Sequence, residues 1–382
     1  MKMIIALFII VSSITLHAKT IEIMSYNVEN LFDAKHDEGK ADWSFLPKDT
    51  AGKTEACNKE RSKFRRQECY HADWTDEKVE IKISQIVDVI TKERNGLPDI
   101  LGLVEVENGE VVGRLAKKLG YEHFEITNSP DNRGVDVALL FKINDDIKKI
   151  SRTEHHVDVD YPTRNILEVE FTIAGHPLTV FVNHWPSLAN PSSWRVKAAN
   201  VLANRTKELM AKNPNMAVIA LGDFNTIDDN DPHPFKTVLH KDNLFLDAAE
   251  SFKSDKTISD EKKKTLAEGT YYYPPKDQWN MLDRIFYNNV LAEGKNLKLD
   301  ISTFEIYLPN FALEENKSKS RRGDDEGGDL KVKLTPKRFD TSAKTKEKMG
   351  YSDHYAVVIK MNYPEKAVVP VKEVKKTPAK KK

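Results

Sequence analysis

The chain has 382 residues with 59 basic and 59 acidic side chains, so its formal net charge at pH 7 is zero. The charge is unevenly placed: residues 364–382 hold seven Lys against two Glu, and without this tail and Lys2 the body keeps 51 basic and 57 acidic residues. A body of net charge −6 does not bind a polyanion through bulk electrostatics, so local basic patches or a bound cation would have to do so. The length is sufficient for one large domain with insertions.

The first eighteen residues are typical of a secretory signal peptide. Lys2 supplies a positive start, Ile4 to Ile14 are almost wholly apolar, and Leu16-His17-Ala18 ends in a small residue. The apolar stretch is short for a membrane span and no second one follows. We therefore expect a periplasmic or secreted protein, without stable membrane insertion once the signal at 1–18 is removed.

Both cysteines lie in a polar, lysine-rich stretch, residues 33–75, which has no sustained hydrophobic period and indicates a long insertion. Cys57 and Cys69 are twelve positions apart. In an exported protein this pair favours one disulfide that closes a surface loop. Free thiols and a metal site that recruits His71 remain as alternatives.

The predicted elements follow in chain order. Alternation predicts a strand over 20–27, and the three-four spacing of apolar residues from Val79 to Ile90 predicts a helix that begins at Thr75. Two further helices are expected over about 112–119 and 193–211. The other predicted strands cover 99–104, 135–141, 167–173, 178–182, 216–222, 283–287, about 303–308 and 355–361.

Many strands with few intervening helices argue against a doubly wound parallel sheet, which needs a helix between nearly every pair of strands. The pattern favours an α/β sandwich of mixed sheets flanked by helices. Residues 253–264 and 314–348 are charge-dense and are expected to be insertions. The tail 364–382, rich in Lys and Pro, is expected to be disordered.

Residues 216–225 contain the sharpest junction in the chain. An uninterrupted apolar run, typical of a strand buried on both faces, stops at Gly222, and Asp223 and Asn225 follow. Their spacing points both side chains to one side of an extended chain. Ordinary turn chemistry would also explain an isolated Asp-x-Asn.

The same arrangement recurs at other predicted strand ends. The polar residues at these ends are Asn27, Glu29, Glu105, Asn183, His184, Asp283, Asp353 and His354. Carboxylates and amides suit a hard divalent ion, and a His oriented by a second carboxylate suits proton transfer near neutral pH. The set therefore indicates metal-assisted attack of water on a phosphate ester.

In this order the motifs resemble those of the endonuclease/exonuclease/phosphatase superfamily, over about residues 19–363. The segments that carry the resemblance are Ser25-Tyr26-Asn27-Val28-Glu29, Asp99 to Glu105, Asn183-His184, Leu221-Gly222-Asp223-Phe224-Asn225, Leu282-Asp283 and Ser352-Asp353-His354. The resemblance implies a four-layer α/β sandwich in which two mixed β-sheets pack face to face between layers of helices.

The resemblance also implies roles for individual residues. Glu105 would be the principal metal ligand, with Asn27 beside it, Asp353 near the ion and Glu29 as a further candidate. His354, held by Asp283, would be the general base or would orient the phosphate. Asp223 and Asn225 would contact the attacking water and the phosphate, and His184 a phosphate oxygen or the leaving group.

Two positions depart from the family pattern: Val104 stands where Gln is usual, and Glu29 where some relatives carry Asp. Outside the motifs, Arg164 and Arg195 are candidates for substrate binding, because guanidinium groups match phosphate oxygens. Tyr271–Tyr273 and the pair His155-His156 are interpreted as packing residues and a surface loop, respectively.

The expected function is that of an exported phosphodiesterase dependent on Mg²⁺ (or Mn²⁺ or Ca²⁺), monomeric, of nuclease type and acting on DNA or RNA. A phospholipid or small-molecule phosphoesterase of the same fold, similar to a sphingomyelinase, is the alternative. Its membrane-inserting hairpin has one candidate, Phe304 to Pro309, which the pattern predicts to be a strand. A surface-binding protein without catalysis, using the lysine tail, is the third hypothesis.

Overall fold

The computed structural model describes residues 18–60, 62–317, 332–343 and 345–365. The predicted signal peptide, apart from Ala18, and almost all of the lysine-rich tail therefore lie outside the described residues. Within them, no helix is both long enough and apolar enough to cross a membrane.

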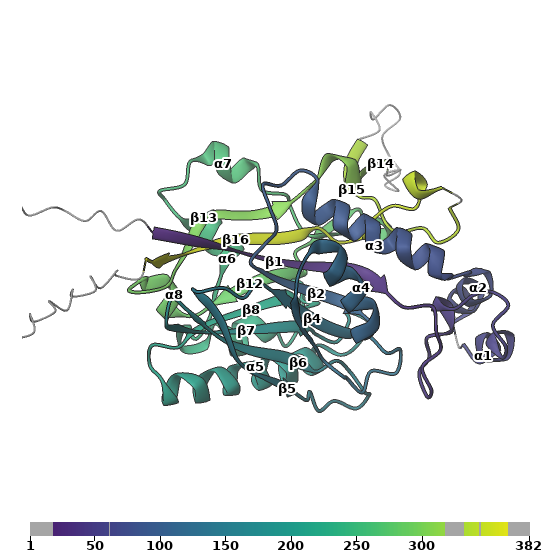
Figure 1. The fold of residues 1–382 in the computed structure, drawn as a ribbon, viewed down its shortest axis with the longest axis horizontal. Helices are drawn as coiled ribbons and strands as arrows, with labels where there is room; N and C mark the ends of the chain where they lie inside the picture. The colour runs from purple at the N-terminus through teal and green to yellow at the C-terminus, as the bar shows by residue number, and fades with distance from the viewer. Residues whose placement is uncertain (1–17, 61, 318–331, 344, 366–382) are drawn as a thin grey trace, which may run out of the picture.

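Two six-stranded mixed sheets form the centre of the molecule (Figure 1). Sheet A has the order β13-β16-β1-β2-β4-β3, with bounds Lys298–Tyr307, Ala356–Pro364, Ala18–Leu31, Ile100–Val106, Asp136–Phe141 and His123–Ile126. Sheet B has the order β5-β6-β7-β8-β12-β9, with bounds Ile147–His155, Ile166–Ile173, His176–His184, Ala217–Asp223, Asp283–Tyr287 and Leu246–Asp247. In each sheet one pair, β1 with β2 and β7 with β8, is parallel.

The buried apolar residues form three hydrophobic cores, because successive side chains of a strand point to opposite faces of its sheet. Ile23 of sheet A and Leu221 of sheet B lie in the core between the sheets. Met24, one residue further along β1, points to the opposite face and packs with helices α3 (Asp76–Thr91) and α4 (Gly109–Leu119). The outer face of sheet B packs against α5 (Ser192–Lys212) and the short turn η2 (Phe235–Leu239).

The helices thus lie on both sides of the stacked sheets, and the predicted four-layer α/β sandwich is confirmed (Figure 1). The helix expected from Thr75 begins there, because the Thr75 side chain accepts a hydrogen bond from Lys78 N. The predicted stretch Phe304 to Pro309 lies largely in β13, where Phe304 and Ile306 are buried.

Several elements were not predicted from sequence, because they are short or lack a clear period. In the 33–75 insertion, α1 (Lys53–Asn58) and α2 (Lys63–His71) are joined by a Cys57–Cys69 disulfide with a Cα–Cα distance of 5.7 Å, as expected. The others are β3, β5, β9, the hairpins β10 (Tyr271–Tyr273) with β11 (Gln278–Asn280) and β14 (Leu313–Lys317) with β15 (Val332–Pro336), and the helices α6 (Ala248–Ser254), α7 (Asp260–Lys264) and α8 (Asn289–Glu293).

One local expectation was wrong. His155 is the last residue of β5 rather than part of a loop, and its Nε2 lies 2.5 Å from Glu168 Oε2 on β6. This pairing across neighbouring strands connects two residues thirteen positions apart, which the residue pattern around His155 does not reveal.

Candidate active site

Three polar side chains lie in one row at the same edge of sheet B, on neighbouring strands. His184 of β7 pairs in register with Asp223 of β8, and Asp223 pairs with Asp283, the first residue of β12. Side chains in one row of a sheet project from the same face. The regular hydrogen-bonded register therefore places an imidazole and two carboxylates side by side.

Gly222 allows β7 and β8 to approach each other at this row. Its φ is +129°, and a Cβ atom at this position would lie 2.0 Å from Asn183 O. Only glycine adopts this conformation without strain and leaves the carbonyl its space. The glycine before Asp223 is thus a requirement of the site geometry.

Sheet A faces this row with Asn27 at β1 and Glu105 at β2, and both lie where the strand register breaks. The pairing of β1 with β2 shifts after Asn27, and the pairing of β2 with β4 shifts between Val104 and Val106. Glu105 has a left-handed φ of 65°. A bulge of this kind redirects a side chain, and strained backbone of this kind collects at functional sites.

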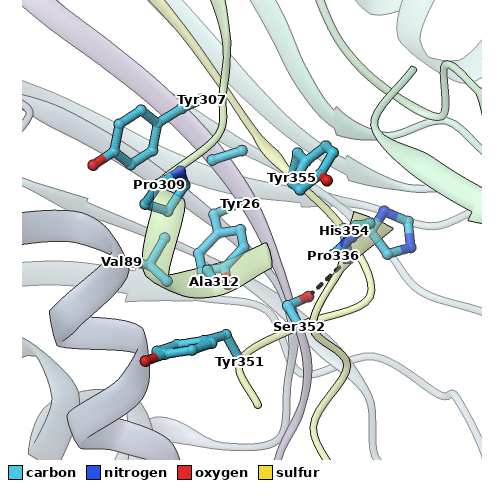
Figure 2. Close-up of a pocket in the computed structure, with 11 residues that line it drawn as sticks. Tyr26, Val89, Tyr307, Pro309, Ala312, Pro336, Tyr351, Ser352, His354 and Tyr355 are labelled. Carbon is cyan, nitrogen blue, oxygen red and sulfur yellow. Dashed lines mark hydrogen bonds between the residues drawn. The ribbon is translucent and has the colours of Figure 1, made fainter. Parts of the chain in front are cut away.

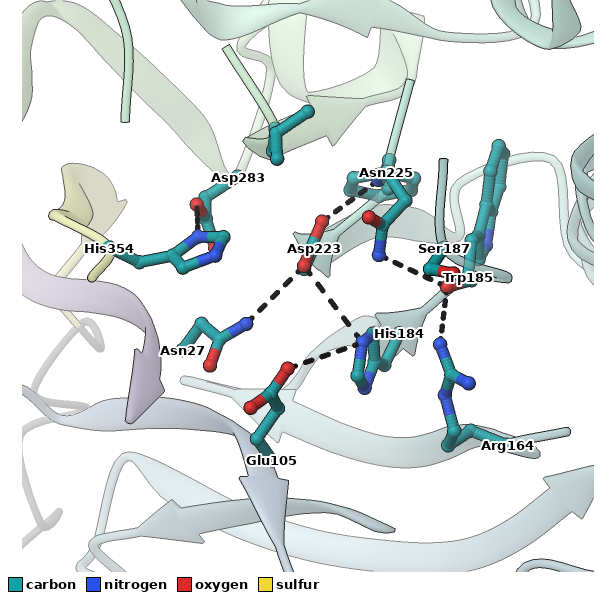
Figure 3. A network of polar contacts seen from close by, with 12 residues as sticks. Asn27, Glu105, Arg164, His184, Trp185, Ser187, Asp223, Asn225, Asp283 and His354 are labelled. Carbon is teal, nitrogen blue, oxygen red and sulfur yellow. Dashed lines mark hydrogen bonds and ion pairs between the residues drawn. The ribbon is translucent and has the colours of Figure 1, made fainter. Parts of the chain in front are cut away.

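Asp223 joins the two sheets through its carboxylate (Figure 3). Its Oδ2 accepts a hydrogen bond from Asn27 Nδ2 at 3.3 Å, and its Oδ1 accepts one from the backbone N of Asn225 at 2.8 Å. Asn225 Nδ2 in turn donates to Trp185 O. Burial and the neighbouring charge of Asp283 raise the pKa of Asp223 to about 7. A carboxyl group with a pKa near neutrality is suited to proton exchange.

His354 is held by Asp283. The His354 Nδ1 lies 2.6 Å from Asp283 Oδ2, and both side chains are almost completely buried (Figure 3). Burial alone would lower the pKa of His354, but the charge of Asp283 and the hydrogen bond to it raise that pKa well above its usual value. The pair therefore favours an imidazolium whose Nε2 is available as a donor.

His184 has the opposite environment. Its Nε2 lies 3.8 Å from Glu105 Oε1 and 3.9 Å from Asp223 Oδ2, and the ring is buried. Burial, together with the positive charge of Arg164, lowers the pKa of His184 well below its usual value. The pKa values of the two histidines are thus shifted in opposite directions, which favours the neutral form of His184 and the cationic form of His354.

Two buried atoms of the site, His184 Nδ1 and Asp283 Oδ1, have no hydrogen-bond partner among the described residues. Unsatisfied buried polar atoms are uncommon in folded proteins and each requires an explanation. Their position beside the row of sheet B indicates that the site is built to bind polar groups from outside the chain.

The oxygen ligands present in the site fit a divalent ion such as Mg²⁺. Glu105 and the buried Asn27 offer a carboxylate and an amide from adjacent strands, and neither forms an ion pair or hydrogen bond with a Lys or Arg side chain among the described residues. Mg²⁺ binds through one or two carboxylates and keeps several waters, so a sparse oxygen set suits it. In the described part of the chain, no three His, Cys, Asp or Glu side chains form a ready-made metal cluster.

The other two expected metal ligands both contact Arg338. Both oxygens of Glu29 are engaged, one by Arg338 Nε and the other by the backbone N of Phe339. Asp353 Oδ2 lies 3.8 Å from Arg338 Nη2, and its Oδ1 lies 3.9 Å from His354 Nε2. The structure therefore pairs Glu29 with Arg338, and the metal roles of Glu29 and Asp353 both stay predictions.

The two expected substrate arginines are buried. Arg164 donates to Trp185 O and lies 3.3 Å from Asp131, at the edge of the network in Figure 3. Arg195 is only 1% exposed, and its Nη1 donates to the carbonyl groups of Pro186, Ser187 and Asn190. The expectation for Arg195 is corrected: it holds the loop after β7 and does not face a substrate. Substrate contact by Arg164 stays a prediction.

Ser352 anchors the segment that carries His354. Its Oγ accepts from the backbone N of His354 at 3.1 Å and donates to Asn27 O at 2.7 Å. Behind His354 lies a small cavity lined mainly by aromatic and apolar side chains, including Tyr26, Tyr307 and Tyr355 (Figure 2). His354 and Ser352 belong to this lining and to the site, so the cavity adjoins the segment that carries His354.

Two further residues lie beside the site without belonging to any of the sequence motifs, Tyr271 and Arg338. The Tyr271 ring centroid lies 5.0 Å from that of His354, although the tyrosine run was interpreted as packing only. Arg338 lies in the charge-dense segment 314–348, where no local pattern distinguishes it from its neighbours. A pattern search could have found neither residue, because both reach the site through long-range contacts.

The sequence profile of the Endonuclease/Exonuclease/phosphatase family matches residues 22–363. The chain therefore belongs to this family, whose members are hydrolytic phosphoesterases that generally use divalent metal ions. A search of curated proteins gives no match.

Solved structures show the same fold at low sequence identity. A humanized D. rerio TDP2 is 15% identical, with a TM-score of 0.52 and coverage of 90% of this chain and 99% of that chain. D. rerio TDP2 complexed with single-strand DNA product is 16% identical, with a TM-score of 0.50 and coverage of 90% and 99%. The mannosyl-6-phosphatase of Bacteroides thetaiotaomicron is 13% identical, with a TM-score of 0.50 and coverage of 89% and 99%.

Proposed function

We propose that this protein is an exported, Mg²⁺-dependent phosphodiesterase that hydrolyses nucleic acid strands by direct attack of water. One observation carries the proposal: Asn27 and Glu105 of sheet A face the row His184, Asp223 and Asp283 of sheet B. Oxygen ligands for a metal ion thus lie opposite a carboxylate for the water, Asp223, and a histidine for the phosphate, His184.

Glu105 and Asn27 would hold the ion, with Asp353 as a third candidate. A bound divalent cation supplies charge stabilisation at the non-bridging phosphate oxygens and at the leaving oxygen. Mn²⁺ and Ca²⁺ bind oxygen donors of the same kind and could substitute in the assay.

Asp223 is the group we assign to the attacking water. Asn27 and the backbone of Asn225 fix its carboxylate from two sides, so an acceptor oxygen is held in one orientation. In this position it orients the water and accepts its proton as the phosphorus–oxygen bond forms. The Asn225 amide is positioned to bind a phosphate oxygen.

The histidines complete the proposed mechanism as donors. Asp283 fixes His354 Nδ1, so the opposite nitrogen can donate to a non-bridging oxygen as negative charge develops there. His184 Nε2, between Glu105 and Asp223, lies where it can bind a second oxygen or the leaving group. Of the two roles expected for His354, we thus propose that it binds the phosphate and does not act as the general base.

Three observations favour nucleic acid over lipid as the substrate. The exposed large apolar side chains in the described ranges are scattered over separate elements: Ile143, Ile150, Tyr161, Tyr273 and Leu334. The proposed membrane-inserting stretch is instead mostly a paired strand of sheet A. The D. rerio TDP2 of the same fold was crystallised with a single-strand DNA product, which supports the choice of substrate class.

Export rests on residues 1–18 and on the Cys57–Cys69 disulfide, a bond typical of oxidising compartments. Cell fractionation of the full-length chain tests it: export predicts a shortened protein outside the cytoplasm, and an unprocessed cytoplasmic protein would contradict it.

The experiment for the activity uses the mature chain from Lys19 with single-stranded DNA, plasmid DNA, RNA, a sphingomyelin vesicle and a sugar phosphate, each with Mg²⁺ or EDTA. We expect EDTA-sensitive cleavage of a nucleic acid. Turnover of the lipid or the sugar phosphate alone would replace this function by the corresponding phosphoesterase, and no turnover at all would refute it.

A further inference from the structure

Arg338 occupies the edge of the site on the side of Asp353. Its Nε donates to Glu29 Oε1, and its Nη2 lies 3.8 Å from Asp353 Oδ2. Asp353 directly precedes His354, the residue that we assign to a phosphate oxygen. The guanidinium group therefore lies one side chain away from the reacting centre, on a segment separate from all the predicted motifs.

The position of Arg338 is preset by its neighbours. The next residue, Phe339, is buried against Trp74, with a ring centroid distance of 5.6 Å. The turn closes at Gly350, whose φ is +74°, and a Cβ there would lie 1.9 Å from Arg338 O. Tyr351 N donates to Lys337 O at 2.7 Å. A side chain placed in this way loses little conformational entropy when it binds a ligand.

Glu29 fixes the Nε edge and leaves the other edge exposed. The Glu29 side chain is 6% exposed, whereas the Arg338 side chain remains 63% exposed. In the described part of the chain the only hydrogen bond that Arg338 donates from its side chain is that from Nε. Nη2 also lies 3.8 Å from Asp353 Oδ2, beyond hydrogen-bond distance, so the Nη groups keep N–H donors for a ligand. Arg195, which we assign to loop support, is instead 1% exposed with its Nη1 on three carbonyl groups.

We propose that Arg338 binds a second, non-reacting phosphate of the substrate, next to the phosphate that is cleaved. A guanidinium fork matches two phosphate oxygens, and it supplies an exposed positive charge on a body that is acidic overall. The preferred substrate is then a strand with phosphates on consecutive units, not an isolated phosphate ester. This inference rests on the proposed phosphodiesterase function and specifies its substrate.

The test uses three thymidine dinucleotides that share one scissile diester: without a terminal phosphate, with a 5′-phosphate and with a 3′-phosphate. We expect the wild-type protein to prefer one of the phosphorylated forms. Arg338→Gln should raise KM for that form by about 10- to 100-fold, the range of a charged hydrogen bond, with kcat changed little. For the unphosphorylated dinucleotide KM and kcat should stay near wild type.

Two further variants sharpen the test. Arg338→Lys should recover part of the preference, because a point charge remains without the fork. Arg152→Gln is the matched control. Arg152 lies on the edge strand β5, is partly exposed and is likewise paired with carboxylates, those of Glu125 and Glu154. This variant should leave KM and kcat unchanged for all three dinucleotides. Circular dichroism checks the fold of each variant.

Equal loss on all three dinucleotides in Arg338→Gln would overturn the inference, because the arginine would then act on the reacting centre or on the fold. No loss on any would overturn it as well. If the wild-type protein cleaves none of them, the proposed function fails separately. Calorimetric binding of the same dinucleotides then decides the role of Arg338: selective weakening for a phosphorylated form supports it, and uniform or absent weakening refutes it.

Discussion

The active-site ends of the two sheets are built in different ways. Sheet B keeps its register to the last residues, so His184, Asp223 and Asp283 stand in one regular row. Sheet A loses its register after Asn27 and around Glu105, and Glu29, Asn30 and Glu105 have left-handed φ values of 54°, 60° and 65°. Regular pairing, with the close approach that Gly222 allows, aligns a row of side chains, whereas turning a single carboxylate toward the opposite sheet requires a bulge and its strain.

A substitution of Glu105 tests the role of the irregular end of sheet A. Glu105→Gln should reduce kcat/KM by about 10³-fold or more, because the carboxylate would be the main charged ligand of the ion. The Mg²⁺ concentration for half-maximal activity should rise as well. Glu110→Gln, at an exposed carboxylate paired with Lys35, is the control and should leave both quantities unchanged. Full activity of Glu105→Gln would remove the metal assignment.

A substitution of Asp283 tests the role of the regular end of sheet B. Asp283→Asn keeps the shape of the side chain but removes the charge that holds His354, so we expect kcat to fall by about 10²-fold. KM should change less than kcat, because the histidine acts mainly as charge develops on the phosphate. The exposed Asp260→Asn on α7 serves as the control. An unchanged kcat in Asp283→Asn would separate His354 from the chemistry.

Gly222 distinguishes backbone requirements from side-chain chemistry. Gly222→Ala should lower the free energy of unfolding by about 2 kcal/mol or more, because the left-handed backbone disfavours alanine and the added methyl group meets Asn183 O. Chemical denaturation measures this change. Gly109→Ala at the start of α4 has open space around the new methyl group, and stability there should be equal or higher. Equal stability of the two variants would contradict the close approach of β7 and β8.

The smallest effect concerns the outer strands of sheet B. Burial alone would raise the pKa of Glu168, but hydrogen bonds from Arg205 and His155 lower that pKa to about 2. Since the pKa of an unfolded Glu is about 4.5, this carboxylate stabilises the folded state above pH 4.5. That contribution is lost as the pH falls from about 4.5 to about 2.

Thermal unfolding across this pH range measures the effect. Glu168→Gln should make the loss of stability shallower between pH 4.5 and pH 2, whereas Glu208→Gln, at a carboxylate that is 62% exposed, should keep the wild-type slope. Identical slopes in wild type and Glu168→Gln would show that the pairing contributes nothing in this range.

Most of the site was visible in sequence because its residues follow strands with strong local signals. The apolar run before Asp223 predicts a buried strand, and Asp223 and Asn225 lie directly after it. The same holds for Glu105 near the end of β2 and for His184 at the end of β7. Arg195 was misassigned, because a guanidinium group in a helix gives no indication of whether it points to carbonyl groups or to solvent.

The order of motifs and the periodicity of apolar residues thus determined the family, the four layers and most polar strand ends, because these features depend on neighbours in the chain. Only the tertiary structure decided how the ends meet: Asn27 bonds Asp223 across 196 positions, and Glu29 is engaged by Arg338 across 309. Contacts at such separations depend on how the sheets pack and where the strands bulge. For this reason only the structure shows that Glu29, an expected metal ligand, is paired with Arg338.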